Sequence, residues 1–140
     1  MRERIAQFLT YRPRHKLVFA PVVSPSIRTV DVGFELASRL KDKLLSAHIS
    51  MIAEDELNSL LKTSIHHDDM IGDYIALRNW GILFEPELKF NLLSIFDSYS
   101  KTSTLILIDC GIADNDNFHL VDKHFNQTLP LGKLSPFIIS

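Results

Sequence analysis

Short apolar runs separated by polar or amphipathic stretches dominate the middle of the chain. Two runs, KLVFAPVV and TSTLILID, are nearly continuous and contain several β-branched residues. Such runs are typical of strands that are buried on both faces of a parallel sheet. A shorter run, AHISMI, resembles them. The sequence therefore predicts four strands, at residues 16–23, 47–52, 73–80 and 102–109.

Between these runs, apolar residues recur at helical spacing. The longest such stretch, 29–45, is expected to be a helix, with Val30, Phe34, Ala37, Leu40 and Leu44 in one apolar stripe. Pro86 is expected to open another helix, because proline is favoured in the first turn. The sequence therefore predicts four helices, at residues 3–11, 29–45, 54–62 and 86–99, with Leu57, Leu60 and Leu61 of the third turned inward.

The order of these elements defines a fold class. A first helix is followed by β-α-β-α-β-α-β, residues 63–72 are expected to be a loop, and edge strands are expected at 118–121 and 136–139. Strands that alternate with helices predict an α/β domain in three layers, with a mainly parallel sheet of four to five strands, helices on both faces and a short β-rich C-terminal tail. A length of 140 residues suits a single domain spanning 1–140.

Composition places the chain among ordinary globular proteins. Hydrophobic residues make up 46%, charged residues 23%, and the net charge is −2. No apolar run approaches the roughly 20 residues of a membrane span, so no membrane contact is expected. The single cysteine, Cys110, excludes an internal disulfide and favours a cytoplasmic location. It is interpreted as a small apolar filler rather than a nucleophile.

Positive charge is concentrated at the N-terminus. The first sixteen residues hold one acid and five cations, Arg2, Arg4, Arg12, Arg14 and Lys16. One interpretation is a solvated helix face followed by a basic turn. The alternative is a nucleic-acid-binding accessory protein that uses this basic N-terminus on a phosphate backbone.

The first strand-to-helix turn is the place where many α/β proteins bind phosphate. Here its sequence is VVSPSIRT, in which Arg28 and Thr29 stand where a P-loop has its lysine and its magnesium-binding hydroxyl. Both glycines are replaced, by Val22 and Ile27, and Pro25 removes an N–H donor. A plain turn, with Ser26 or Thr29 capping the next helix, is the other interpretation.

A magnesium-binding acid is the second requirement of a nucleotide site. Asp109, at the end of the run LILID, is the best candidate by sequence shape, although it is also suited to a turn. If the strand at 73–80 carried the acid instead, its position would fall at Arg78 or Asn79. One alternative is therefore an ATP-binding or ATP-hydrolysing small subunit that holds ATP and Mg²⁺ with Arg28, Thr29 and Asp109.

Adjacent histidines in the run SIHHDD do not predict a metal site. Neighbouring side chains on a regular element point in different directions, and no spaced second pair accompanies His66 and His67. A polar loop is the expected role of this run.

The second half of the chain resembles the small P-loop protein of type 3 BREX phage-defence systems and its relatives. The resemblance lies in ILFEPELK at 82–89, YSK at 99–101, DCG at 109–111 and the tail segments 118–120 and 134–139. It implies a P-loop-like fold of the additional-strand type, in which the third strand carries the magnesium-binding acid. The first half of the chain matches only in the order of strands and helices.

The chain departs from that family at both nucleotide positions, because VVSPSIRT lacks the glycines and lysine and Arg78 and Asn79 replace the acid. The expected function is therefore a non-catalytic accessory or adaptor subunit, without cofactor or metal. Its expected partner is a larger protein of the same antiviral (BREX-like) or DNA-restriction operon, with DNA contacted indirectly or weakly. Docking is expected through an exposed edge strand or the 84–89 turn, and the contact residues are Phe84, Glu85, Glu87 and Lys89. Core packing is the alternative role of Phe84.

Overall fold

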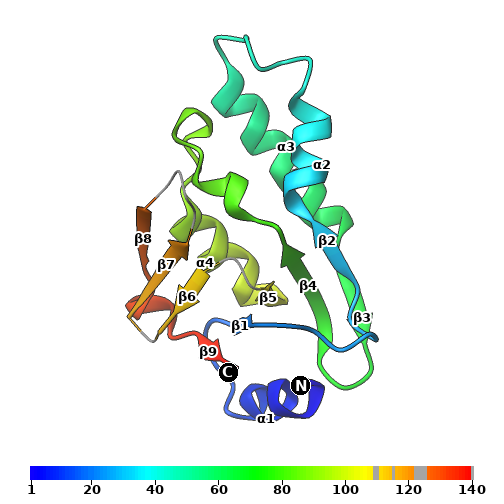
Figure 1. Ribbon diagram of the computed structural model, residues 1–140. Coiled ribbons are helices and arrows are strands. Elements are labelled where there is room, and N and C mark those ends of the chain that lie inside the picture. Colours follow the sequence, from blue (N-terminus) through cyan, green and yellow to red (C-terminus); the bar gives the residue numbers. More distant parts are fainter. Residues whose placement is uncertain (109–110, 115, 122–125, 140) are drawn as a thin grey trace.

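A six-stranded sheet forms the centre of the computed structural model, which describes residues 1–108, 111–114, 116–121 and 126–139 (Figure 1). The strands lie in the order β2-β4-β5-β1-β9, and every pair along this path is parallel. A short strand, β3, pairs antiparallel with the start of β4. The strand bounds are Leu17–Ala20 (β1), Thr29–Asp31 (β2), His66–Asp68 (β3), Gly72–Arg78 (β4), Thr104–Ile108 (β5) and Phe137–Ile138 (β9). The prediction of a mainly parallel sheet is confirmed.

Alternating side chains of the central strands build two cores, one on each face of the sheet. One core contains Leu17 and Phe19 of β1 and the helices α2 (Val32–Leu40), α3 (Ile49–Thr63) and α4 (Leu92–Thr102). The other contains Val18 and Ala20 of β1, Ile5 of α1 (Arg2–Thr10) and Ile27. Helices therefore lie on both faces, and the predicted three-layer arrangement is confirmed.

The chain after β5 forms a separate antiparallel sheet, β6-β7-β8, with bounds Gly111–Ala113, Asn117–Val121 and Asn126–Pro130. Phe118 of β7 is buried in the same core as α4, so this small sheet packs on the face of the main sheet that α2, α3 and α4 cover. A 3-10 turn, η3 (Gly132–Leu134), then leads to β9 at the edge of the main sheet. The predicted β-rich tail is confirmed, and β9 is an edge strand as expected, but the strand expected at an edge at 118–121 is β7, the middle strand of the small sheet. Within the described ranges, no helix combines the length and apolarity that a bilayer crossing requires.

The strand predicted at 47–52 is wrong, because these residues lie in the connection before α3 and in its first turn. A six-residue apolar run cannot distinguish a strand from a buried helix segment by periodicity alone. The following residues settle the matter, since Ala53, Leu57 and Leu61 recur every four residues and are all buried. The predicted burial of Leu57, Leu60 and Leu61 is confirmed.

The helix predicted at 29–45 is correct only in its middle. Residues 29–31 form β2, and the helix begins at Val32 because the side chain of Asp31 accepts a hydrogen bond from the Phe34 N–H at 2.9 Å. Neither Ser26 nor Thr29 caps it. The predicted stripe is correct at Leu40, which is buried, and at Val30, which packs against the core from β2. It is wrong at Phe34, Ala37 and Leu44, which are exposed; Val32 and Leu36 are buried instead.

The helix predicted from Pro86 to Tyr99 is interrupted. Two 3-10 turns, η1 (Gly81–Phe84) and η2 (Pro86–Leu88), precede α4. Lys89 then adopts a left-handed conformation, with φ 52°, which ends η2. Asn91 starts the true helix by accepting a hydrogen bond from the Ser94 N–H at 3.2 Å. The predicted loop at 63–72 is also partly wrong, because it contains β3.

Candidate functional site

The segment that follows β4 is anchored by Trp80. Its side chain is fully buried, and its indole N–H donates to the carbonyl oxygen of Ile108 at 3.1 Å. The indole ring contacts the rings of Phe84, Phe96 and Phe118, with centroids 4.7–5.9 Å apart. A buried aromatic cluster of this kind restrains the backbone that leaves it. The 84–89 turn therefore starts from a fixed point.

The turn itself is held by local hydrogen bonds. The Glu85 N–H donates to Ile82 and the Leu88 N–H to Glu85, each at 3.1 Å. Leu88 is buried below the turn, so Glu87 and Lys89 project into solvent and Glu85 is half-buried. The turn therefore presents charged groups from a restrained backbone.

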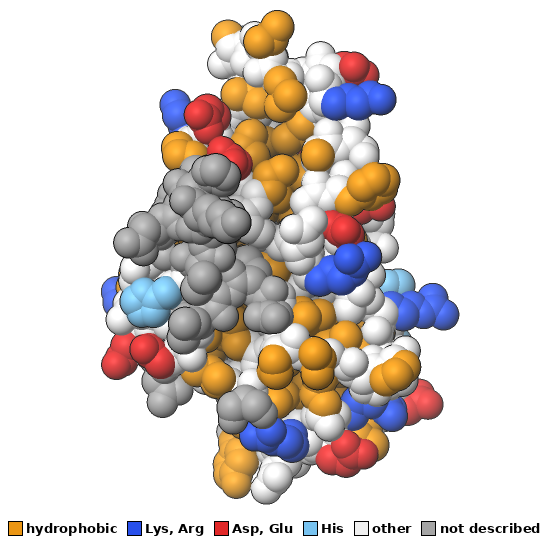
Figure 2. Space-filling model, in the orientation of Figure 1, with side chains coloured by type: hydrophobic (Ala, Val, Ile, Leu, Met, Phe, Trp, Pro, Cys, Tyr) orange, Lys and Arg blue, Asp and Glu red, His pale blue; other side chains and the backbone are white. Residues whose placement is uncertain are grey.

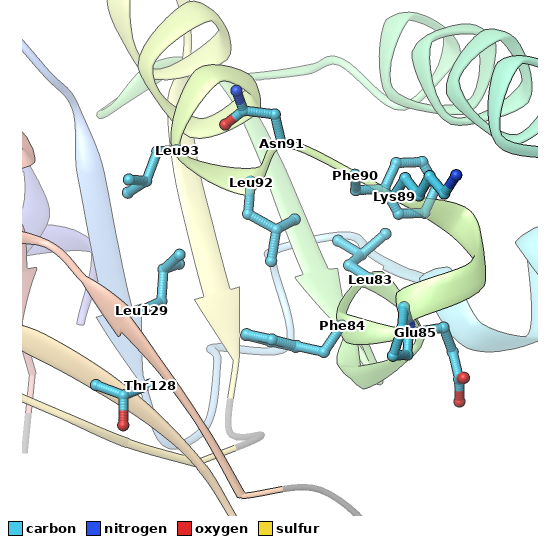
Figure 3. Close-up of a pocket in the computed structure, with 11 residues that line it drawn as sticks. Leu83, Phe84, Glu85, Lys89, Phe90, Asn91, Leu92, Leu93, Thr128 and Leu129 are labelled. Atoms are coloured by element: carbon cyan, nitrogen blue, oxygen red, sulfur yellow. The ribbon is translucent and has the colours of Figure 1, made fainter.

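A pocket of about 490 Å³ lies between this turn, the start of α4 and the strand β8 (Figure 3). In Figure 3, Phe84 and Leu92 reach into the space from one side and Leu129 of β8 from the other, while the carboxylate of Glu85 points away. The apolar part of the lining is Leu83, Phe84, Pro86, Phe90, Leu92, Leu93 and Leu129. Its chemistry suits apolar side chains of a ligand.

A second pocket, of about 800 Å³, continues the first and shares Asn91 and Leu93 with it. Successive residues of β8 line the two pockets, Thr128 and Leu129 the first and Pro130 the second. Successive side chains of a strand point to opposite faces, so a groove that meets all three must run along the strand's edge. That edge is unoccupied among the described strands, because β8 pairs only with β7. We call this feature the β8 groove.

Charged residues stand at both ends of the β8 groove. Glu85 and Lys89 lie at one end, and Asp116 and Lys133 at the other. No ion pair joins any of these four to another described residue, whereas the nearby Asp97 is already paired with His15 and Lys101. Lys101 and then His15 lower the pKa of Asp97 by donating hydrogen bonds to its carboxylate. The groove thus has an apolar middle and ends whose charges are available.

The four predicted contact residues are not equivalent in the structure. Glu85 and Lys89 line the groove, Glu87 lies on the exposed side of the turn outside the lining, and Phe84 is only 7% exposed. Phe84 belongs to the aromatic core and also forms part of the pocket wall. Sequence reasoning missed Leu93 and the β8 residues Thr128, Leu129 and Pro130, because no local pattern brings β8 to the 84–89 turn.

Arg28 and Thr29, the residues of the nucleotide alternative, do not lie at the end of β1. The chain crosses one face of the sheet after β1, with Ile27 buried and the Arg28 N–H donating to the Tyr74 hydroxyl at 2.9 Å. Thr29 begins β2, which is separated from β1 by β5 and β4. The turn after β1 therefore does not lead into a helix at the strand's carboxyl end. Asp109 and Cys110 lie outside the described residues.

At the end of β4, one of the two positions considered for a magnesium-binding acid, the structure has a cluster of hydrogen-bonded side chains. Arg78 and Asn79, at the end of β4, donate to the two carboxylate oxygens of Asp31 at 3.2 and 2.8 Å. The Phe34 N–H and then Asn79 lower the pKa of Asp31. Gly33 keeps the arrangement close, because a Cβ there would stand 2.5 Å from the Asn79 side-chain nitrogen. Asp31 is a structural acid that sequence reasoning did not single out.

The basic N-terminus is partly used inside the molecule. Arg2 forms an ion pair with Asp68 at 2.9 Å, and this guanidinium lowers the pKa of Asp68. Arg4 lies over the ring of Phe137.

His67 pairs with Asp73 at 3.0 Å, and the described residues contain no group of three or more side chains that could hold a metal ion.

Comparison with family models, curated proteins and solved structures finds no match for this chain.

Proposed function

We propose that this protein is a non-catalytic accessory subunit that docks a larger protein through the β8 groove. One observation carries the proposal: an apolar channel along an unoccupied strand edge, bounded by charged residues that pair with no described residue. Pre-formed concave sites with an apolar lining and a few polar groups are characteristic of specific binding. Among the described residues that line the site, no nucleophile lies beside a base, and binding is the function that its apolar lining and free strand edge support best.

The edge of β8 supports a particular mode of docking. An extended segment of the partner would add a strand beside β8, and its main chain would hydrogen-bond to the free edge. Alternate side chains of that segment would lie against Leu93 and Leu129, where apolar surface is available. Lys89, which lines one end of the groove, would favour an acidic group on the partner there and fix the direction of the segment.

The identity of the partner is proposed from the family resemblance. It is a larger subunit of the same antiviral, BREX-like or DNA-restriction operon, and DNA is reached through that subunit rather than directly. The strand order supports the fold that this resemblance implies. In the sheet, β5 lies as an additional strand between β1, the first strand, and β4, the strand expected to carry the acid. The same proposal places the protein in the cytoplasm.

The test is co-purification with the proteins encoded beside this gene, followed by measurement of Kd. Leu93→Asp is expected to weaken binding at least tenfold, because it puts a charge in the apolar middle of the groove. Lys89→Glu is expected to weaken it and to alter its salt dependence, while the matched change Lys62→Glu, on the exposed side of α3, leaves it unchanged. The proposal fails if no neighbour co-purifies, or if Leu93→Asp and Lys89→Glu both bind as the parent does.

The ATP-binding alternative, with Arg28, Thr29 and Asp109, makes a different prediction. A nucleotide at a hundredfold excess over its Kd stabilises a true binder by about 2.7 kcal/mol. Because the chain after β1 crosses the sheet face, we expect no shift of thermal unfolding with millimolar Mg-ATP. A clear upward shift would restore the nucleotide-binding interpretation.

A further inference from the structure

The pairing of β7 with β8 fixes which backbone groups of β8 face its free edge. Asn117 of β7 lies opposite Pro130, which has no N–H to donate. Beyond this pair, the Leu131 N–H donates to the carbonyl oxygen of Asp116 at 2.6 Å. A bond in that position identifies Asn117 and Pro130 as a pair without hydrogen bonds of its own.

The remaining residues of β8 follow from this pair, because hydrogen-bonded and non-hydrogen-bonded pairs alternate along an antiparallel ladder. The pair at Leu129 is hydrogen-bonded, so its N–H and C=O point to β7. The N–H and C=O of Thr128 therefore point to the free edge, and those of Asn126 do the same. Pro130 offers only its C=O there. The edge thus presents the N–H groups of Asn126 and Thr128, and Pro130 ends the run of donors.

The side chains of β8 alternate between two different surroundings. Leu129 packs against the core that contains α4, and in Figure 3 it points toward Leu93. Thr128 is exposed on the opposite face, where its hydroxyl lies 3.1 Å from Nδ1 of His119. Side chains directly opposite one another on paired strands share a face. A strand added beside β8 would therefore place alternate side chains against the two leucines and beside Thr128.

The helix α4 lies below the position of such an added strand. Leu93 is 36% exposed and lines the groove together with Ser94 and Asp97, close to Pro130 of β8. Leu93 and Asp97 are four residues apart and so lie on one side of the helix. The sheet β6-β7-β8 leaves this strip of α4 uncovered at its free edge. A fourth strand would extend the small sheet over it.

The two ends of the β8 groove differ in the charges that they present. In Figure 2, charged side chains of both signs gather over the 84–89 turn, at the end of the groove near the start of β8. Of these, Lys89 lines the groove, whereas the carboxylate of Glu85 points away from it (Figure 3). At the other end, Asp116 and Lys133 both line the groove. An acidic residue of a ligand is therefore favoured at the Lys89 end.

From these observations we propose that the β8 groove recognises a short extended peptide whose register is set by the main chain of Thr128. The inference rests on the proposed docking function and specifies its ligand. The peptide has apolar side chains at alternate positions, directed toward Leu93 and Leu129, and an acidic residue at the Lys89 end. It has no proline at the residue whose N–H donates to the Thr128 carbonyl oxygen.

Selection from a displayed library of random peptides, with the full chain as the target, tests this pattern. We expect enriched sequences in which apolar and polar residues alternate, with an acidic residue at one constant end. Apolar residues repeated at three and four positions would indicate a helical ligand and would overturn the proposal. The absence of any enriched sequence would also overturn it.

An N-methyl scan of the best selected peptide tests the ladder without any change to the protein. Each methyl group removes one N–H donor, and only alternate N–H groups of a bound strand face β8. The peptide's Kd is expected to rise about tenfold or more at those alternate positions, since each loses a main-chain hydrogen bond, and to change little at the positions between them. A scan without this period of two would contradict strand addition.

Variants of the protein separate this inference from the docking function on which it rests. Thr128→Pro removes the N–H at the free edge, and Thr128→Val retains it, so the peptide's Kd should be about tenfold higher or more for the proline variant. Equal Kd values would contradict the proposal. If Leu93→Asp weakens binding but the N-methyl scan shows no alternation, the groove binds its ligand in another way and only this inference fails. If neither Leu93→Asp nor Lys89→Glu affects the selected peptides, docking through the groove fails as well.

Discussion

Single side chains at the carboxyl edge of the sheet decide how α2 begins. Asp31 accepts hydrogen bonds from the Phe34 N–H and from Asn79, and it pairs with Arg78. These contacts join β2, α2 and β4 at one carboxylate. Gly33 is required beside them because of its close approach to Asn79. The residues that replace a magnesium-binding acid thus have a structural role of their own.

Asp31→Ala is expected to destabilise the protein by about 1 kcal/mol, the usual effect of removing a helix N-cap. Asp31→Asn keeps the capping oxygen and should have a smaller effect. Urea unfolding measures both, and Asp42→Ala serves as the control because Asp42 is exposed and no ion pair joins it to a described residue. An effect at Asp31 no larger than that at Asp42 would show that the cluster is not stabilising.

At the scale of elements, the 84–89 turn is shaped by one residue in an unusual conformation. Lys89 has φ 52° and ψ 39°, in the left-handed region that disfavours residues with a Cβ. It ends η2 and redirects the chain toward Asn91 and α4. The relative placement of the turn and α4, and therefore one wall of the β8 groove, depends on this reversal.

Lys89→Gly is expected to stabilise the protein by on the order of 0.5 kcal/mol, because the relief of left-handed strain exceeds the added entropy of glycine in the unfolded chain. Lys89→Val should destabilise it by more than about 1 kcal/mol, since a β-branched residue tolerates this conformation poorly. Glu87→Gly is the control within the same turn and should be destabilising by about 0.5–1 kcal/mol. If urea unfolding shows that Lys89→Gly and Glu87→Gly change the free energy of unfolding in the same direction, this account is wrong.

At the scale of the whole molecule, carboxylates connect parts of the chain that are distant in sequence. Asp68 joins the β3–β4 hairpin to Arg2 of α1, and Asp97 joins α4 to His15 in the segment after α1. In the folded protein the pKa of Asp68 is lowered mainly by Arg2, and that of Asp97 mainly by Lys101. Asp31 and Asp114 are lowered mainly by backbone N–H donors.

These shifts predict a loss of stability in acid. A carboxyl whose pKa is lowered by folding binds its proton more tightly in the unfolded chain. Its contribution to the free energy of unfolding is therefore complete above the unfolded pKa, near 3.9, and is lost as the pH falls from there through the lower pKa of the folded protein. Unfolding free energies measured from pH 7 to pH 2 should therefore fall most steeply below about pH 4. Asp68→Asn should reduce that slope, whereas Asp42→Asn should not. An unchanged slope in Asp68→Asn would contradict the assignment.

Much of the fold is predictable from local pattern, for identifiable reasons. The runs that became β1, β4 and β5 are apolar on both faces, and this is a property of a few consecutive residues. The predicted strand at 47–52 fails because its apolar run is too short to define a period. The predicted stripe on α2 is right at Leu40 but wrong at Phe34 and Ala37, because periodicity alone does not say which apolar positions of a helix face the core.

The sequence by itself determined the layered α/β class, the buried central strands and the loss of the glycines that a phosphate loop needs, because each follows from the chemistry of neighbouring residues. Only the tertiary structure decided that the 84–89 turn meets β8, that the chain after β1 crosses the sheet face, and that Phe34 remains in solvent. Those outcomes depend on strand order and on contacts between distant segments, which residue periodicity does not encode.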